Sequence, residues 1–251
     1  MNILGVIPAR YASSRFPGKA LCIIDGKSMI QRVYEQARQC DQLTRVLVAT
    51  DHEMIKSHVS EFGGNVVMTS EAHQSGTERC CEALELADKG ASGNGTDIVI
   101  NIQGDEPFIN PQQISEVISC FDNPSAGIAT LAGKINLQEE IFNPNVVKVV
   151  FNDNHSVLYF SRSAIPTIRD AEPGTWLDHG TFYKHIGIYG YRAAILKQLV
   201  ILPATSLEES ESLEQLRWLQ HGFPIAIRET SFRSISIDTP ADLKKLTNNS
   251  F

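Results

Sequence analysis

The chain has 251 residues, of which 42% are hydrophobic and 20% charged, and its formal net charge is −7. This length and composition suit one globular domain with a sizeable core, and the acidity argues against nucleic acid as a partner. Five cysteines without a CxxC spacing argue against a disulfide framework or a zinc site. Because no segment has the pattern of a signal peptide or a membrane span, we expect a cytoplasmic protein without a membrane partner.

Buried strands and amphipathic helices alternate in the first half of the chain. Four β-branched runs with almost no polar alternation predict strands buried on both faces: Ile3–Ile7, Val46–Ala49, Val66–Met68 and Ile98–Ile102. Apolar residues at helical spacing predict helices at Ile30–Ala37, Met54–Phe62 and Glu78–Lys89. This order predicts a parallel sheet with helices on both faces.

The second half is richer in strands, which we expect to pair antiparallel in several places: Gly127–Ala132, Val146–Phe151, Val157–Phe160, Ile186–Tyr191 and Ile225–Ile227. Helix starts are predicted from the capping patterns Asn110-Pro111-x-Gln113, Ser206-x-x-Glu209 and Thr239-Pro240-x-Asp242. The stretch Ile165–Tyr183 predicts a long mobile loop that serves as a dimerisation arm or a lid. No linker or repeat interrupts the chain, so we expect a single domain over residues 1–251.

A cluster of cations follows the first predicted strand. Within ARYASSRFPGK, the candidate phosphate-binding residues are Ala9, Arg10, Ser13, Ser14, Arg15 and Lys19. Open α/β sheets bind ligands at the carboxyl ends of their strands, where small residues admit a phosphate chain and cations neutralise it. A solvated basic loop is the alternative. The chain contains no GxGxxG or Walker motif, which argues against dinucleotide binding and ordinary kinase chemistry.

Two aspartates follow predicted strands. Asp105 comes after Ile98–Ile102 and could hold Mg²⁺ against a triphosphate, or cap the turn before Pro107. Asp238 comes after an expected strand at Ser234–Ile237 and could equally be a helix-start residue. Beside Asp105, the Gln103 amide can both donate to and accept from a nucleobase.

The segment IPARYASSRFPGK resembles the triphosphate-binding loop of the sugar-acid cytidylyltransferases, specifically of members acting on 3-deoxy-manno-octulosonate (KDO). Further blocks resemble the same family in the same order: ATDHE (49–53), HQSGTER (73–79), NIQGDEPFI (101–109), FNPNVVKVV (142–150), YFSRSAIP (159–166), HIGIYGYR (185–192), LEQLRWL (213–219) and IDTPADL (237–243). The resemblance covers essentially the whole chain; the stretches 171–181 and 203–212 depart from it.

The resemblance implies a three-layer Rossmann-like nucleotidyltransferase fold, with a mostly parallel mixed sheet and an antiparallel extension in the second half. It implies a homodimer that converts CTP and KDO to CMP-KDO and pyrophosphate for lipopolysaccharide biosynthesis. It further implies that Asp105 and Asp238 share a Mg²⁺ ion. Rival readings are transfer to a sialic acid or to 8-amino KDO, and a non-catalytic nucleotide-sensing module.

The resemblance also implies two sets of binding residues. Besides the candidates after the first strand, the CTP set contains Ser75, Arg79, Gln103 and Asp105. Ser75 could instead be a helix cap, and Arg79 could pair with Glu82. The sugar-acid set contains Gln103, Lys148, Arg162, His185, Tyr189, Glu214 and Gln215. Alternatively, His185 is a polar strand end, Lys148 faces water, and the last two residues face solvent.

The implied mechanism is in-line attack of the C2 hydroxyl of the sugar on the α-phosphorus of CTP. We expect Arg10, Arg15 and Lys19 to hold the leaving phosphates, while one Mg²⁺ bridges the triphosphate. A second Mg²⁺, on Asp105 and Asp238, lowers the pKa of the attacking hydroxyl in this scheme.

Overall fold

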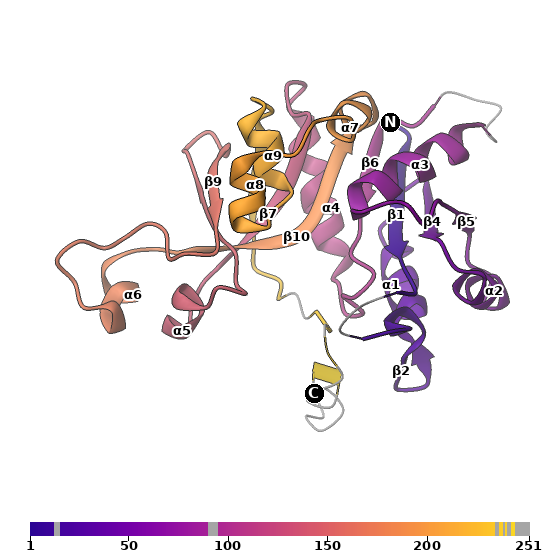
Figure 1. Cartoon of the computed structure of the whole chain (residues 1–251), viewed down its shortest axis with the longest axis horizontal. Helices are drawn as coiled ribbons and strands as arrows, with labels where there is room; N and C mark the ends of the chain where they lie inside the picture. The colour runs from indigo at the N-terminus through magenta and orange to yellow at the C-terminus, as the bar shows by residue number, and fades with distance from the viewer. Residues whose placement is uncertain (13–15, 90–94, 234–235, 238, 240–241, 244–251) are drawn as a thin grey trace. The chain divides into compact units, whose positions relative to one another are not determined.

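The computed structural model describes residues 1–12, 16–89, 95–233, 236–237, 239 and 242–243, and its elements are marked along the chain in Figure 1. The chain divides into two compact units, and each unit combines segments that are far apart in the sequence. Unit 1 contains Met1–Ser115, Arg192–Val200 and Ser234–Phe251, and unit 2 contains Glu116–Tyr191 and Ile201–Arg233. The expectation of one domain stays a prediction.

Unit 1 is built on a parallel sheet in which the strands lie in the order β6-β1-β4-β5. The strands are β1 (Ile3–Ala9), β4 (Arg45–Thr50), β5 (Val66–Met68) and β6 (Ile98–Asn101). Leu4, Val6 and Val48 are fully buried, as expected for a strand that is covered on both faces. The positions of all four predicted strands are confirmed, and β1 continues two residues further than predicted, to Ala9. Burial on both faces is wrong for β5, because this strand lies at the end of the strand order and all three of its residues are partly exposed.

Helices connect and flank these strands. They are α1 (Met29–Ala37), α2 (Glu53–Glu61), α3 (Gly76–Lys89), α4 (Pro111–Ser119) and α7 (Ala193–Leu199), with a 3-10 helix η1 (Lys19–Leu21) and a small hairpin of β2 (Ile23–Ile24) and β3 (Lys27–Ser28) before α1. The predicted capping box of α4 is confirmed. The Gln112 N–H donates to Asn110 Oδ1 at 2.9 Å, and the Asn110 N–H donates to Gln113 Oε1 at 3.1 Å.

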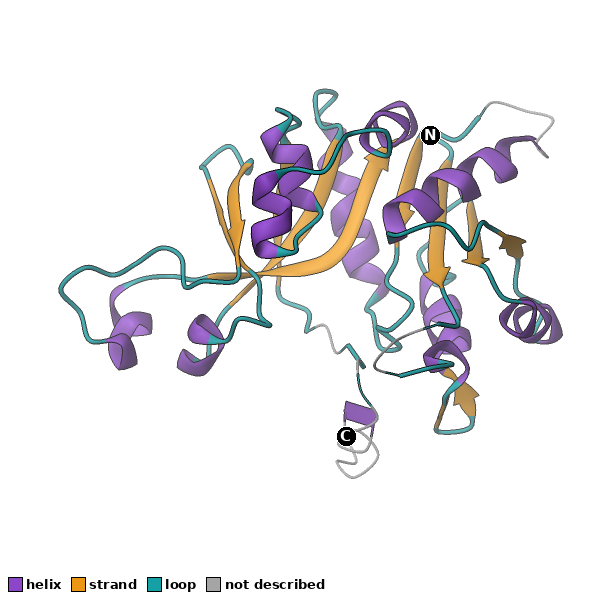
Figure 2. Ribbon diagram, in the orientation of Figure 1, coloured by secondary structure: helices purple, strands orange, loops and turns teal. Residues whose placement is uncertain are grey.

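Unit 2 is mainly antiparallel. Its strands are β7 (Ile128–Lys134), β8 (Lys148–Phe151), β9 (Val157–Ser161), β10 (Tyr183–Arg192) and β11 (Ile225–Thr230). β10 pairs antiparallel with β7 and β8, and β8 pairs antiparallel with β9, whereas β11 lies parallel to β7. The long strand β10 curves (Figure 2), and its register with β7 shifts between Ile186 and Tyr189. The helices of this unit are η2 (Cys120–Asp122), α5 (Gln138–Phe142), η3 (Pro173–Thr175), α6 (Trp176–His179), α8 (Ser206–Glu211) and α9 (Gln215–Gln220).

Three sequence expectations need correction. The stretch 165–183 is not structureless, because it contains η3 and α6, and its Trp176 and Phe182 are buried in an apolar cluster with Ile135 and Ile141. Helix α8 takes Thr205 rather than Ser206 as its N-cap, without a side-chain capping bond. Ser236 and Ile237 lie outside any strand, and the rest of the expected strand 234–237 lies outside the described residues. The arm or lid role stays a prediction.

Two further observations concern disulfide bonds and membrane-spanning helices. Cys22, Cys40, Cys80, Cys81 and Cys120 are all free thiols. Over the described ranges of the chain, every helix is too short or too polar to cross a bilayer.

Candidate active site

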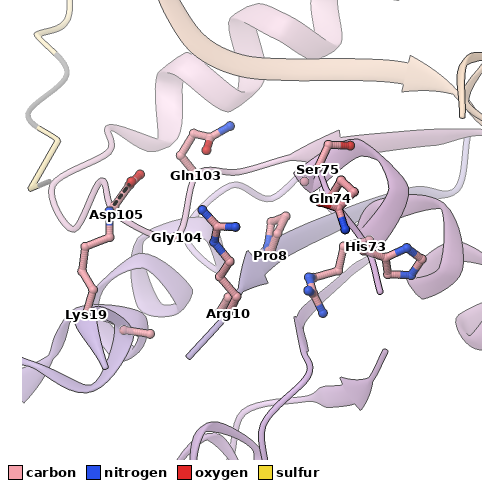
Figure 3. A pocket seen from close by; sticks show the side chains of 13 residues that line it. Pro8, Arg10, Lys19, His73, Gln74, Ser75, Gln103, Gly104 and Asp105 are labelled. Atoms are coloured by element: carbon pink, nitrogen blue, oxygen red, sulfur yellow. Dashed lines mark hydrogen bonds and ion pairs between the residues drawn. The ribbon is translucent and has the colours of Figure 1, made fainter. Parts of the chain in front are cut away.

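A pocket of about 290 Å³ opens in unit 1 at the carboxyl ends of β1 and β6. Three segments line it, namely the end of β1 with the following loop, the start of α3 and the loop after β6. In Figure 3, Lys19 and Asp105 lie at one side of the pocket and His73 and Gln74 at the other, with Arg10 between them. The lining residues are Pro8, Ala9, Arg10, Lys19, Ala20, His73, Gln74, Ser75, Gly76, Arg79, Gln103, Gly104 and Asp105. The structure therefore gathers every described residue of the CTP set.

The loop after β6 reaches this pocket because Gly104 lets it pass directly against β1. A Cβ atom at position 104 would lie 2.7 Å from the backbone oxygen of Pro8, closer than real Cβ atoms approach. This close approach brings the neighbours of Gly104, Gln103 and Asp105, to the end of β1. Steric contact with β1 therefore explains why a glycine occupies this position of the NIQGDE block.

Lys19 is held next to Asp105. The Lys19 Nζ atom lies 2.7 Å from Asp105 Oδ2, and both side chains are partly buried. Gly18, which precedes Lys19, has a φ of 69°, a left-handed conformation that favours glycine. Its N–H donates to the Tyr11 carbonyl oxygen at 3.0 Å, which holds Gly18 next to Tyr11. The cation-rich segment and the carboxylate after β6 therefore meet in one site.

Arg79 of α3 lines the same pocket, although only 4% of its surface is exposed. Its Nη2 atom lies 2.8 Å from Asp51 Oδ2, and its Nη1 donates to Thr69 Oγ1 at 2.6 Å and to the Ser70 carbonyl oxygen at 3.3 Å. The alternative pairing of Arg79 with Glu82 is wrong. Glu82 instead accepts from the Ser70 N–H.

Ser75 is a helix cap that also lines the pocket, and its contact with CTP stays a prediction. Its hydroxyl oxygen accepts from the Glu78 N–H at 3.2 Å, so it caps α3, and it also lines the pocket. The 14-residue helix α3 therefore points its N-terminal end, with its partial positive charge, at the pocket.

Four predicted site residues lie outside the described residues: Ser13, Ser14, Arg15 and Asp238. The neighbour of Asp238 is described, since the Ile237 N–H donates to the Asp105 carbonyl oxygen at 3.0 Å. Within the described part of the chain, no group of three or more His, Cys, Asp or Glu side chains could hold a metal ion. A metal here would need the one or two protein carboxylates that Mg²⁺ usually takes.

Lys148, from the predicted sugar-acid set, is fully buried in unit 2. Its ammonium donates to three backbone carbonyl oxygens, those of Asn143 at 2.8 Å, Val146 at 2.5 Å and Arg162 at 2.6 Å. Burial lowers the pKa of Lys148, partly offset by Glu211. The alternative that this side chain faces water is wrong, because the lysine is buried and ties together the chain around β8 and β9. A direct role with the sugar acid stays a prediction.

Arg162 has a similar arrangement. Its guanidinium donates to the carbonyl oxygens of Glu211 at 2.6 Å, Pro144 at 3.1 Å and Ser212 at 3.3 Å. Three of its five N–H groups thus satisfy backbone, two of them at the C-terminal end of α8. A direct role with a ligand stays a prediction.

His185 and Tyr189 on β10 form an aromatic cluster in unit 2. Their ring centroids are 5.1 Å apart, and the Tyr189 ring lies 5.2 Å from that of Trp218. The Tyr189 hydroxyl is buried without a hydrogen-bond partner among the described residues. Burial raises its pKa, and Tyr191 and Glu214 add to this shift. The hydroxyl is therefore neutral and able to bond a ligand.

The protonation of His185 follows from its surroundings. Burial lowers its pKa to about 3, so the ring is neutral at pH 7. Thr130 Oγ1 lies 3.0 Å from His185 Nε2 and donates its own proton to the backbone oxygen of Ile188 at 2.7 Å. A neutral imidazole has one donor and one acceptor nitrogen in either tautomer. His185 can therefore receive a hydrogen bond from a hydroxyl group, and its contact with the sugar acid stays a prediction.

The last two sugar-acid candidates differ in exposure. Gln215, the first residue of α9, is 6% exposed, so the solvent-facing alternative is wrong for it. Glu214 is the N-cap residue of α9 and is partly buried.

Comparison with known proteins gives the family of the chain. The cytidylyltransferase family model matches residues 4–230. The 3-deoxy-manno-octulosonate cytidylyltransferase of Parabacteroides distasonis is 51% identical over 98% of this chain and 96% of its own length, and that of Thermodesulfovibrio yellowstonii is 48% identical over 97% and 96%. The solved structure of a CMP:2-keto-3-deoxy-manno-octonic acid synthetase complexed with CTP is 40% identical, with a TM-score of 0.90 over 99% of this chain and 98% of that one.

The chain belongs to the cytidylyltransferase family. It is an enzyme of the nucleotidyltransferase type, with the mixed α/β fold expected from its sequence.

Sequence reasoning missed several pocket residues of this cytidylyltransferase. Pro8, Gly104, His73 and Gln74 line the pocket, and Asp51 contacts Arg79. Gly104 could have been found, because a glycine between two candidate site residues after a buried strand suggests a close backbone approach. Asp51 directly follows β4 and Asp105 comes in the loop after β6, so an aspartate after a buried strand was also a usable signal.

Proposed function

We propose that this cytidylyltransferase transfers the cytidylyl group of CTP to the C2 hydroxyl of KDO and releases pyrophosphate. The pocket of unit 1 carries the proposal, because it places Arg10, Lys19 and Arg79 around Gln103 and Asp105 at the carboxyl edge of a parallel sheet. The near full-length identity to proteins named for this activity supports the choice of both substrates.

The cations of the pocket would bind the triphosphate and stabilise the departing pyrophosphate. Lys19 is paired with Asp105 in this structure, and Arg10 is exposed. Both lie next to the N-terminal end of α3, which favours anions. We assign Arg15 the same role from the family resemblance. Charge neutralisation and positioning supply most of the catalysis in phosphoryl-type transfer.

Gln103 would recognise the base. A side-chain amide can accept from the exocyclic amine of cytosine and donate to its carbonyl oxygen. The close packing of Gly104 against Pro8 limits the room in which Gln103 can move.

The residues present fit a magnesium ion. Asp105 offers carboxylate oxygens of the kind Mg²⁺ prefers, and the bond from Ile237 N–H to Asp105 brings the segment preceding Asp238 to the same place. We propose that Asp105 and Asp238 hold the ion, which would lower the pKa of the attacking hydroxyl and neutralise phosphate charge. Lys19 would then exchange Asp105 for a phosphate oxygen.

The His185–Tyr189 cluster would bind hydroxyl groups of the sugar acid. The neutral His185 offers an acceptor, and the Tyr189 hydroxyl lacks a partner among the described residues. Glu214 and Gln215 would add an acceptor and an amide at the start of α9. Lys148 and Arg162 would support this half indirectly, through the backbone that they bind.

We propose further that the protein is a cytoplasmic homodimer without nucleic-acid or membrane partners. The free cysteines agree with a reducing compartment. Leu137 and Phe142 in unit 2 are 56% and 43% exposed, and they border a shallow pocket with Pro173 and Gly174. An exposed apolar surface of this kind suits a contact between subunits.

Pyrophosphate release tests the proposed reaction. The assay contains the purified chain, Mg²⁺, one nucleotide from CTP, ATP and GTP, and one acceptor from KDO, 8-amino KDO, a sialic acid and a neutral sugar phosphate. We expect release with CTP and KDO and far less with the purine nucleotides. Equal turnover with the neutral sugar phosphate would contradict the proposal, and binding of CTP without turnover of any acceptor would favour the nucleotide-sensing alternative.

A further inference from the structure

We propose that Asp51 is a positioning residue that holds both Arg79 and the loop after β1 in the geometry that CTP requires. Here the phosphate loop is defined by its described parts, residues 10–12 and 16–19. The inference rests on the proposed function, because it assigns a role within the same nucleotide site. Asp51 belongs to the ATDHE segment (49–53).

The sheet brings Asp51 to the level of the pocket. Strand β4 lies beside β1, with Thr50 opposite Ala9 in the register. Thr50 is fully buried and ends the strand, so Asp51 is the first residue beyond the carboxyl edge. Arg10 holds the corresponding place after β1 and lines the pocket.

The two carboxylate oxygens of Asp51 contact two different parts of the site. Oδ2 lies 2.8 Å from Arg79 Nη2, and Oδ1 accepts from the Tyr11 N–H at 3.4 Å. Tyr11 directly follows Arg10 in the chain. One side chain thus links the helix that carries Arg79 with the backbone that carries Arg10.

Tyr11 is held at two further points. Its ring stacks on that of His52, with centroids 4.0 Å apart and planes 14° from parallel. His52 is itself oriented, since its Nδ1 accepts from the Met54 N–H at 3.3 Å and caps α2. The Tyr11 carbonyl oxygen accepts from the Gly18 N–H, which joins the two described parts of the phosphate loop next to Lys19. Asp51 and His52 therefore anchor the base of this loop.

The contacts of Arg79 show which of its N–H groups remain available to a ligand. A guanidinium that is 4% exposed needs a counter-charge, and Asp51 supplies it. Asp51, Thr69 and Ser70 take three of its five N–H groups. The other two have no acceptor among the residues that the structure describes, and Arg79 lines the pocket. The network fixes the guanidinium and leaves donors for an anionic ligand.

The test compares Asp51→Asn with Asp88→Asn by isothermal titration with CTP and by steady-state kinetics. Asp88 is a matched control, because it pairs with Arg45 at 3.2 Å in the same unit and does not line the pocket. Both variants lose one arginine–carboxylate ion pair. We expect Asp51→Asn to raise the Kd and the KM for CTP about tenfold or more and to leave the KM for KDO unchanged, whereas Asp88→Asn binds CTP like the wild type.

A second variant, Asp51→Glu, keeps the inference testable if Asp51→Asn does not fold. Asp51→Glu keeps the charge that Arg79 requires but moves the carboxylate by one methylene, so we expect a similar rise in the Kd for CTP. A folded Asp51 variant with the wild-type Kd, or an equal rise in Asp88→Asn, would overturn the inference alone. Failure of the wild-type chain to bind CTP would instead overturn the proposed function.

Discussion

Replacement of Lys148 by methionine separates a structural role of this lysine from direct sugar binding. Methionine retains most of the length and apolar surface of the side chain but removes the ammonium. The three carbonyl oxygens of Asn143, Val146 and Arg162 would then lose a donor inside the fold. We therefore expect Lys148→Met to lower the free energy of unfolding.

The size of the loss follows from these three bonds. A buried acceptor without a partner costs about 1–3 kcal/mol, so three of them give a gross loss of about 3–9 kcal/mol. Burial of the lysine ammonium costs several kcal/mol of desolvation, and methionine removes this cost, which offsets part of the loss. We expect a net loss of about 2–4 kcal/mol.

Urea unfolding followed by circular dichroism measures this loss, with Lys184→Met as the control. Lys184 lies opposite Lys148 in the ladder of β8 and β10, but it is partly exposed and pairs with Glu140. Its loss should cost less than about 1 kcal/mol. A Lys148→Met protein with wild-type stability and a raised KM for KDO would refute the structural reading and restore Lys148 as a direct ligand.

Three further predictions concern the two halves of the site. The pKa of His185 is about 3 in the folded protein and about 6.5 in the unfolded chain, so acidification from pH 7 to pH 5 protonates only the unfolded state. The free energy of unfolding of the wild type should therefore fall by about 2 kcal/mol more than that of His185→Gln over this pH range. Equal losses of both proteins in urea titrations would contradict this. Lys19→Ala should lower kcat about a hundredfold, while Lys27→Ala, an exposed lysine paired with Glu35, should match the wild type. Asp105→Asn and Asp238→Asn should each cripple turnover across a Mg²⁺ titration, and the double variant should be little worse than the worse single one; strictly additive losses would show that they share no ion.

The strands and helices of unit 1 are largely predictable from local sequence. An unbroken apolar run predicts a strand, and the run Val66–Met68 gives the bounds of β5, although this strand at the end of the sheet is only partly buried. The capping box at Asn110–Gln113 is equally local, because its two hydrogen bonds join residues three apart or less. The short helix α6 was missed because its stability comes from packing of Trp176 against distant residues such as Phe182 and Ile135, not from its own four residues.

The geometry of the His185–Tyr189 cluster could not be read from spacing. In a regular strand, residues four apart lie about 13 Å from each other, at roughly 3.3 Å per residue. The centroids of the two rings are nevertheless 5.1 Å apart, and the register of β10 with β7 shifts between Ile186 and Tyr189. Gly187 inside a strand pattern was the local sign of such a bulge, but not of its consequence.

The sequence by itself determined the alternation of elements, the candidate nucleotide residues and the family resemblance, because these depend on residue type and order along the chain. Only the tertiary structure decided the partners of the buried cations. Lys148 binds three carbonyl oxygens, and Arg79 takes Asp51 rather than Glu82. A buried charge must be compensated by whichever group the fold brings within hydrogen-bond distance, and strand order rather than sequence distance sets that group.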